Sequence, residues 1–259
     1  MTPLVLLHGF MDSPRTWELA LPALEREHEV LVPALVGHFG GPPVDGELTA
    51  EVLADGVERA MDAAGLDTAH VAGNSLGGYL ALKLAERGRA RSVVAFAPAG
   101  GWQDDSWRTT LALQERIHEQ TRAAAPRAAE ILATPEGRRR ATRYITVNYE
   151  HIPADLLEHQ LLGVAACTAV GPAIAAARRG GWPLDAERVT CPLRIVWGAE
   201  DRLLPWPAAA ERHRAAFPNA DWVLLDGVGH SPQLDVPLEA AQLILGFTSQ
   251  RRSRSGASA

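Results

Sequence analysis

The chain has 259 residues and a formal net charge of −6 at pH 7, with 47% hydrophobic and 22% charged residues. This size and composition are typical of a globular protein with one large core, and they exclude the disordered and fibrous classes. The negative charge argues against nucleic acid as a partner, because nucleic-acid binders gain affinity mainly from Lys and Arg side chains that neutralise phosphates.

The first residues, MTPLVLLHGF, are apolar but lack the basic start of a secretory signal, and they reach His8 and Gly9 almost at once. No segment approaches the ~18 consecutive apolar residues of a membrane span, so no membrane partner is expected. The two cysteines, Cys167 and Cys191, have no CxxC spacing, which predicts reduced thiols in a cytoplasmic protein. Neither a phosphate-binding glycine motif nor an H-E-x-x-H cluster occurs, so we expect no cofactor and no metal.

Short apolar runs alternate with longer helical patterns along the chain, in the order typical of a parallel sheet with helices on both faces. We expect six strands, at residues 4–7, 30–35, 70–72, 92–97, 193–197 and 222–225. We expect helices between and after them, at residues 16–27, 49–64, 76–87, 208–216 and 237–248. The pattern therefore predicts an α/β fold.

One region interrupts this alternation. Residues 101–187 contain no convincing strand but much Ala, Glu, Arg and Leu, with prolines as breaks, which predicts about four helices inserted between two strands. We therefore expect a core formed by residues 1–100 and 188–249 and a helical cap formed by residues 101–187. The basic, Ser-rich end over residues 250–259 is expected to be a disordered tail.

Ser75 is the candidate nucleophile. It lies in the stretch GNSLGG, which fits the pattern G-x-S-x-G between a strand-like run and a helical one. Glycines on both sides let backbones pass closely at a strained strand-to-helix turn that presents the hydroxyl. Because a serine hydroxyl is a poor nucleophile until a base takes its proton, the assignment needs a base and an acid elsewhere. The alternative is a serine that only caps the following helix.

A base and an acid are expected after the fifth and sixth strands, because the chain order of this arrangement is serine, acid, histidine. His213 lies in a helical stretch, whereas His230 lies in a glycine-containing loop just past the last strand. Ligands of open α/β sheets bind beyond the carboxyl ends of the strands, where such a loop can place an imidazole. The run WGAED after the fifth strand offers Asp201 as the acid that orients His230, with Glu200 as the weaker alternative.

An oxyanion hole requires two backbone N–H donors. Leu76, directly after the candidate nucleophile, is expected to supply one of them. The loop after the first strand, LLHGFMD, is expected to supply the other from Phe10, with Met11 as the second choice. His8 is interpreted as a structural residue of this loop rather than a catalytic one.

With these residues in place, the chain resembles the α/β-hydrolase superfamily over residues 3–249. The resemblance rests on the motifs HGF at 8–10, GNSLGG at 73–78, WGAED at 197–201 and GH at 229–230, in the family's order and spacing. It implies a six-stranded parallel sheet, a helical cap and Ser-His-Asp chemistry. Family members usually begin with an antiparallel hairpin, but the first strand here starts at residue 4, so we expect the sheet to lack its first two strands. The loop Gly37-His38-Phe39-Gly40 also departs from the GHGxS that relatives commonly have there.

The sequence favours a serine hydrolase that cleaves an ester or related acyl bond of a small, apolar substrate through an acyl-enzyme. A lyase without cofactor, or a carbon-carbon bond hydrolase, is an alternative that would use the same triad. A ligand-sensing protein with a mobile lid is an alternative of another class. Four aromatic residues in or beside the cap are candidate substrate contacts, although aromatics at helical positions more often form the core of a cap; they are Trp102, Trp107, Tyr149 and Trp182.

Overall fold

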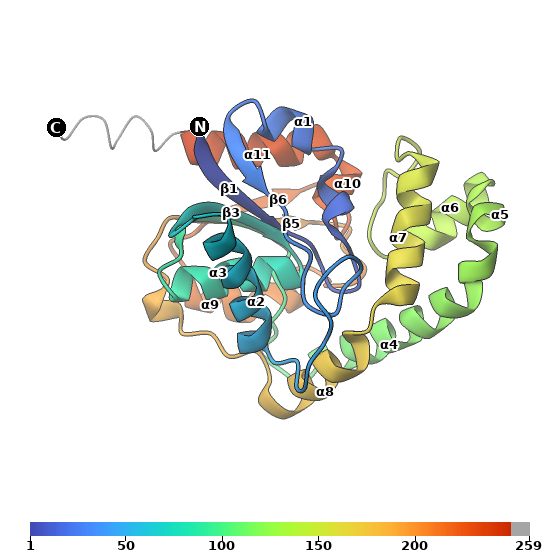
Figure 1. Cartoon of the computed structure of the whole chain (residues 1–259), viewed down its shortest axis with the longest axis horizontal. Helices are drawn as coiled ribbons and strands as arrows, with labels where there is room; N and C mark the ends of the chain where they lie inside the picture. Colours follow the sequence, from blue (N-terminus) through green and yellow to red (C-terminus); the bar gives the residue numbers. More distant parts are fainter. Residues whose placement is uncertain (250–259) are drawn as a thin grey trace.

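The computed structural model describes residues 1–249, and the predicted tail at 250–259 lies outside them. Its centre is a six-stranded sheet in the order β2-β1-β3-β4-β5-β6, in which every neighbouring pair is parallel (Figure 1). The strands are β1 (Thr2–Leu7), β2 (His28–Leu31), β3 (Ala69–Asn74), β4 (Ala90–Phe96), β5 (Leu193–Gly198) and β6 (Asp221–Leu225). The expected fold class is confirmed, and within residues 1–249 the sheet contains no antiparallel strand.

The strand order reverses between β1 and β3, because the chain goes from β1 to β2 on one side and returns to β3 on the other. Leu7 pairs with Gly73 in the ladder, so the two strands end side by side. In open α/β sheets a crevice for ligands forms at such a reversal, beyond the carboxyl ends of the strands. The loop after β1 and the turn after β3 therefore meet at one place.

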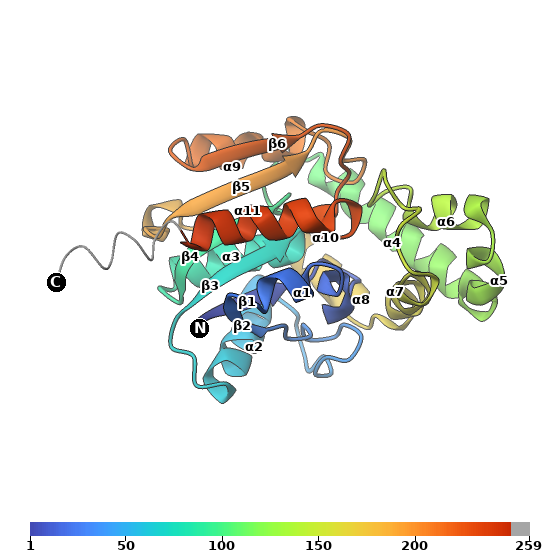
Figure 2. The ribbon, with the colours of Figure 1, turned by 90° about the horizontal axis from the view of Figure 1, so that it is seen from above.

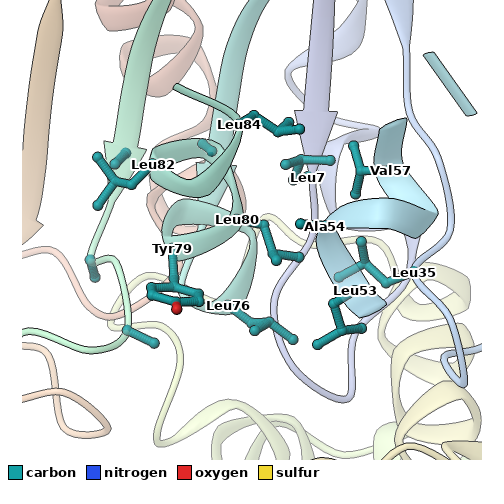
Figure 3. Packing of buried hydrophobic residues seen from close by; sticks show 14 of the residues in the cluster. Leu7, Leu35, Leu53, Ala54, Val57, Leu76, Tyr79, Leu80, Leu82 and Leu84 are labelled. Atoms are coloured by element: carbon teal, nitrogen blue, oxygen red, sulfur yellow. The ribbon is translucent and has the colours of Figure 1, made fainter. Parts of the chain in front are cut away.

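Helices cover both faces of the sheet (Figure 2). The helices α2 (Ala50–Ala63), α3 (Leu76–Glu86) and α9 (Glu211–Ala216) lie on one face, and α1 (Leu21–Leu24) and α11 (Pro237–Ser249) lie on the other. Figure 3 shows Leu80 and Leu84 of α3 directed toward α2 and β1, where they pack with Val57 and Leu7. Because both faces are buried, the strands are nearly continuous apolar runs rather than alternating ones.

Two predicted elements are shorter than expected. The predicted helix at 16–27 is a 3-10 turn, Pro14–Trp17, followed by the four-residue α1. Trp17 of the turn is completely buried against the sheet, so tertiary packing outweighs the helical pattern there. The predicted strand at 30–35 ends at Leu31, because Pro33 has no N–H for a ladder and the amide of Leu35 donates to His8 Nε2 instead.

The inserted segment between β4 and β5 folds as helices that extend past the carboxyl ends of the strands (Figure 2). Its α-helices are α4 (Trp107–Ala124), α5 (Ala128–Leu132), α6 (Pro135–Thr142), α7 (Ala154–Ala166) and α8 (Val170–Gly180). The exact cap borders at 101 and 187 stay a prediction. Over residues 1–249, no single helix is both long and apolar enough to cross a membrane, and α7 and α8 pass that test only as a pair bent by 65°.

Candidate active site

Ser75 lies in a strained turn between β3 and α3. Its backbone has φ 57° and ψ −116°, in the positive-φ region that residues other than glycine rarely adopt. A Cβ on Gly73 would lie 2.2 Å from the carbonyl oxygen of Gly77, and one on Gly77 would lie 2.3 Å from that of Leu7. The glycines are thus required by close backbone contacts on both sides of the serine. Although Ser75 is at the N-cap position of α3, its side chain makes no capping hydrogen bond, which argues against a capping role.

His230 and Asp201 form a buried pair in the loops that follow β6 and β5. His230 Nδ1 lies 2.7 Å from Asp201 Oδ2, and both side chains are almost completely buried. The other carboxylate oxygen, Oδ1, accepts hydrogen bonds from the amides of Leu203 (2.9 Å) and Leu204 (2.7 Å). A proton held on Nδ1 by this carboxylate leaves Nε2 as the free acceptor of the ring. Nε2 is buried and has no hydrogen-bond partner among residues 1–249.

The alternative acid, Glu200, lies apart from this pair. It is exposed at the surface, and its backbone amide donates to the carbonyl of Val228 at 2.9 Å. Of the two carboxylates proposed from the sequence, it is therefore Asp201 that contacts His230.

The loop after β1 packs directly against the serine. A Cβ on Gly9 would lie 3.5 Å from Ser75 Cβ, so the following residue, Phe10, is held beside the turn. Within the described part of the chain, the amides of Phe10 and Leu76 have no hydrogen-bond partner, which leaves both free to hold an oxyanion. Met11, the second choice for this role, follows Phe10 in the same loop and adopts a positive φ of 61°.

His8 holds this loop in place. Its Nε2 accepts a hydrogen bond from the Leu35 amide at 3.0 Å, and its Nδ1 lies 2.9 Å from the carbonyl oxygen of Gly9. Burial and the neighbouring His38 lower the pKa of the His8 imidazole to about 3, so the ring stays neutral and can accept and donate at once. This is a structural role, as the sequence analysis expected.

Two cavities meet at Ser75, beneath the cap. The larger, of about 370 Å³, extends from Ser75 and Leu76 between α4 and α8. The smaller, of about 150 Å³, contains Ser75 and His230 together and extends toward α7. Phe10 from the core and Gln114 from α4 line both cavities. A substrate whose reacting carbon sits at Ser75 therefore has two separate spaces for its two halves.

The four aromatic candidates are in different places. Trp102 and Trp182 line the larger cavity beside Ser75, with ring centroids 6.3 Å apart. Trp107 lies in a separate surface hollow at the start of α4, under the guanidinium of Arg108. Tyr149 packs in an apolar cluster of the cap with residues such as Ile152 and Leu132. The structure thus brings two of the four toward the serine and places the other two away from both cavities.

Sequence reasoning missed two residues of the site, Asp12 and Gln114. Asp12 follows Met11 in the loop after β1 and lines the smaller cavity near His230. An acid in the loop that is expected to form the oxyanion hole is a signal that the sequence did contain. Gln114 lies in the middle of a helix with no motif around it, so only the packing of the cap shows that it borders both cavities.

Comparison with known proteins agrees with this arrangement. The model of the alpha/beta hydrolase family matches residues 4–243. Epoxide hydrolase EphH of Mycobacterium tuberculosis is 34% identical over 212 residues, which cover 78% of this chain and 96% of that protein. Pimeloyl-(acyl-carrier protein) methyl ester esterase of Aromatoleum aromaticum is 30% identical over 258 residues, which cover 93% of this chain and 96% of that protein.

Solved structures show the same fold. A thermophilic esterase from Thermogutta terrifontis superposes with a TM-score of 0.73 at 21% identity, covering 96% of this chain and 90% of that one. A meta-cleavage product hydrolase from Pseudomonas fluorescens superposes with a TM-score of 0.73 at 19% identity, covering 97% of this chain and 92% of that one. The chain belongs to the alpha/beta hydrolase family.

Proposed function

We propose that the protein is a serine hydrolase that cleaves an ester or related acyl bond of a small, apolar substrate through an acyl-enzyme. The observation that carries this proposal is the buried contact between His230 Nδ1 and Asp201 Oδ2, which leaves Nε2 unpartnered in the cavity that also contains Ser75. The similarity to a methyl ester esterase over nearly the whole chain supports it.

The proposed reaction follows from this geometry. His230 Nε2 takes the proton of Ser75 Oγ as the oxygen attacks the carbonyl carbon, and the amides of Phe10 and Leu76 hold the developing oxyanion. Asp201 keeps the ring oriented and stabilises the imidazolium. His230 then gives the proton to the leaving oxygen, and a water molecule activated by the same ring releases the acid.

The two cavities take the two halves of the substrate. Because His230 must pass a proton to the leaving oxygen, the leaving group belongs in the smaller cavity, which contains His230. The acyl part then occupies the larger cavity, whose walls include Trp102, Trp182 and Leu111. Its largely apolar lining is the reason that we propose an apolar acyl group.

Carbon-carbon bond hydrolysis is the second candidate. A 2-hydroxymuconate semialdehyde hydrolase from Pseudomonas is 32% identical over 104 residues, which cover 38% of this chain, so the local sequence is shared with a protein of that kind. Epoxide hydrolysis, which another relative is named for, is disfavoured because Ser75 stands where a nucleophilic Asp would indicate that chemistry.

The test is a set of variants measured against a panel of acyl esters with a phosphonate probe. The probe should label Ser75, because Ser75 shares a cavity with the unpartnered Nε2 of His230, which can take the proton of its hydroxyl. Ser75→Ala and His230→Ala should each lower ester kcat by about 10⁴-fold or more, because triad members act as a unit. Asp201→Asn should cost roughly 10²- to 10⁴-fold, whereas Glu200→Gln should be nearly silent.

Other outcomes separate the alternatives. If Glu200→Gln loses most of the ester kcat while Asp201→Asn keeps it, the acid of the triad is misassigned. If the probe labels Ser75 but no ester is cleaved faster by the wild type than by Ser75→Ala, ester hydrolysis is wrong. Turnover of a meta-cleavage product would then favour the carbon-carbon hydrolase, and binding without any turnover would favour a ligand sensor.

A further inference from the structure

Asp12 is an acidic residue of the smaller cavity that the proposed triad does not use. It follows the Phe10-Met11 turn after β1, and it lines the same cavity as Ser75 and His230. The only charged or chargeable groups among the lining residues of this cavity are Asp12, His230 and the phenol of Tyr144. Neither Lys nor Arg lines it, so the carboxylate has no cation to pair with there.

The surroundings of Asp12 leave its charge poorly compensated. Its Oδ1 accepts a hydrogen bond from the Ser13 amide at 2.8 Å, and the hydroxyl of Thr16 donates to the carboxylate. Burial raises the pKa of Asp12 to about 6, and these two hydrogen bonds together with the nearby His230 only partly oppose the rise. Two neutral donors are weak compensation for a partly buried negative charge, and a cationic ligand would supply the missing partner.

The rest of the cavity suits an alkylated cation rather than a strongly hydrated one. Its lining combines aliphatic residues such as Ile117 and Leu157 with the aromatic residues Phe10 and Tyr144 and with polar side chains such as Gln160. Rings of this kind attract ammonium groups through their faces, and aliphatic walls favour the alkyl substituents. The guanidinium of Arg143 lies over the Tyr144 ring, 4.7 Å from its centroid, but Arg143 is exposed and does not line the cavity.

We propose that Asp12 makes the smaller cavity a binding site for a cationic leaving group, namely the alkylammonium alcohol of a choline-like ester. This inference rests on the proposed ester hydrolysis, because that reaction places the leaving group on the His230 side of Ser75. It limits the apolar part of the proposed substrate to the acyl group in the larger cavity. Asp12 is a specificity-determining residue in this scheme. It binds the departing alcohol and takes no part in proton transfer.

A pair of isosteric esters tests the proposal. Hexanoylcholine and 3,3-dimethylbutyl hexanoate have the same shape and differ by one positive charge, so the ratio of their kcat/KM values isolates the charge. At pH 8 the wild type should prefer the choline ester by about tenfold, the size expected for a charge-assisted contact. In Asp12→Asn, which keeps an acceptor for the Ser13 amide, the ratio should fall to near one. Changes in folding or in the position of His230 lower both rates and cancel in the ratio.

A matched variant controls for net charge. Glu29→Gln removes one negative charge from an exposed position of β2, outside both cavities, and should keep the preference for the choline ester. The preference should also weaken below pH 6, as Asp12 takes up a proton. The ionisable groups around the Asp12 loop are His230, His159, whose Nε2 lies 3.1 Å from Ser13 Oγ, and Arg15, which pairs with Glu18 and Asp155. A charge on any of these groups acts on the choline ester and not on its neutral isostere. Asp12→Asn is therefore measured over the same pH range, and the pH dependence of the ratio should be lost in that variant.

The outcomes distinguish this inference from the proposed function. A wild-type ratio near one, or a preference that persists in Asp12→Asn, overturns the role of Asp12 while ester hydrolysis stands. If neither ester is cleaved and the phosphonate probe does not label Ser75, the proposed function fails and this inference fails with it. If Ser75 is labelled without turnover, protection of that labelling by choline and by 3,3-dimethylbutanol is compared, and equal protection overturns the inference.

Discussion

At the scale of single residues, the site depends on positions where neighbouring backbones approach so closely that only glycine fits. Gly77 lies where a Cβ would meet the carbonyl oxygens of Leu7 and His8 at 2.3 and 2.6 Å. Both oxygens belong to backbone at the end of β1, so neither can move without shifting the loop that carries Phe10. The positive φ of Ser75 is held by the same packing, and a strained serine of this kind persists only where its surroundings fix it.

The first prediction at this scale is that Gly77→Ala lowers both the stability of the fold and the rate of ester hydrolysis. It should lower the free energy of unfolding by roughly 2 kcal/mol or more, because a buried methyl forces backbone apart. It should also lower ester kcat/KM by at least about tenfold through displacement of the oxyanion donors. Chemical denaturation and kinetics on the same samples measure both effects.

Gly246→Ala is the matched control for this change. Gly246 lies inside α11, and a Cβ there would meet nothing within 4 Å. Because alanine is a better helix former than glycine, this variant should gain about 1 kcal/mol and keep full activity. A Gly77→Ala protein with wild-type kinetics would show that the serine turn tolerates a shift of β1, against the account given above.

At the scale of elements, the cap determines the shape of the substrate space. Residues of α4 and α8 wall the larger cavity, and α4 together with α7 walls the smaller one. Gln114 of α4 borders both cavities. The core therefore carries the proposed reacting groups, and the cap forms a large part of the cavity walls that would distinguish one substrate from another.

The prediction at this scale concerns the acyl chain. Ala177 of α8 lines the larger cavity, so Ala177→Phe should shorten it. We expect kcat/KM for octanoyl esters to fall by roughly tenfold or more, while acetyl esters keep their rate, because an apolar pocket discriminates by the methylenes it can bury. A series of p-nitrophenyl esters of increasing chain length measures this.

Ala175→Phe is the control on the same helix. Ala175 is partly buried but does not line the cavity, so the same enlargement should leave the chain-length profile as in the wild type. If Ala177→Phe instead narrows the choice of alcohol and not of acid, the two cavities have been assigned to the wrong halves of the substrate.

Local motifs made the core of this site predictable from the sequence. Ser75, Asp201 and His230 each stand beside glycines or at a strand end, and the sheet brings such positions to one edge. The six-stranded parallel sheet followed from the family resemblance, and the strands followed from their apolar runs. Nothing in a local pattern could show that Trp17 is buried as part of a 3-10 turn, or that Leu35 turns away from the ladder to bind His8.

The cap was harder to predict because local sequence patterns do not show how helices pack against the core. Its helices carry similar patterns of Ala, Leu and Arg, so the sequence does not say which face of each helix meets the core. Trp102 and Trp107 are five positions apart, yet only Trp102 lines the cavity beside Ser75. Asp12 was overlooked because the proposal for it depends on the lack of Lys and Arg among the residues that line its cavity. The sequence alone does not show which residues line that cavity.

At the scale of the whole molecule, several histidines are buried without a negative partner. Burial lowers the pKa of His8 to about 3 and those of His38 and His213 to about 4. Each ring is held by neutral hydrogen bonds, as in the contact of His213 Nε2 with the carbonyl oxygen of Ala99 at 2.9 Å. These rings are neutral in the folded protein at pH 5 but protonated in the unfolded chain, whose histidines titrate near pH 6.5.

This difference predicts acid sensitivity. At about pH 5 the unfolded chain binds roughly three more protons at these histidines, so folding stability rises with pH across this range. Asp12 acts in the opposite direction, because its raised pKa makes the folded protein hold about one proton that the unfolded chain has lost. Over these four groups the balance is about two protons, which corresponds to a contribution of roughly 3 kcal/mol per pH unit to the slope near pH 5.

His213→Gln should reduce this slope. Glutamine can still donate to the Ala99 carbonyl but binds no proton, so the slope near pH 5 should fall by about 1.4 kcal/mol per pH unit. Phe217→Leu is the control, because its ring packs 6.2 Å from the His213 ring and its loss destabilises the fold without removing a proton-binding site. Urea denaturation between pH 4.5 and 6.5 gives the slope for each protein. If His213→Gln and Phe217→Leu lower stability equally at every pH, His213 does not take up its proton on unfolding, and the acid sensitivity of the molecule has another origin.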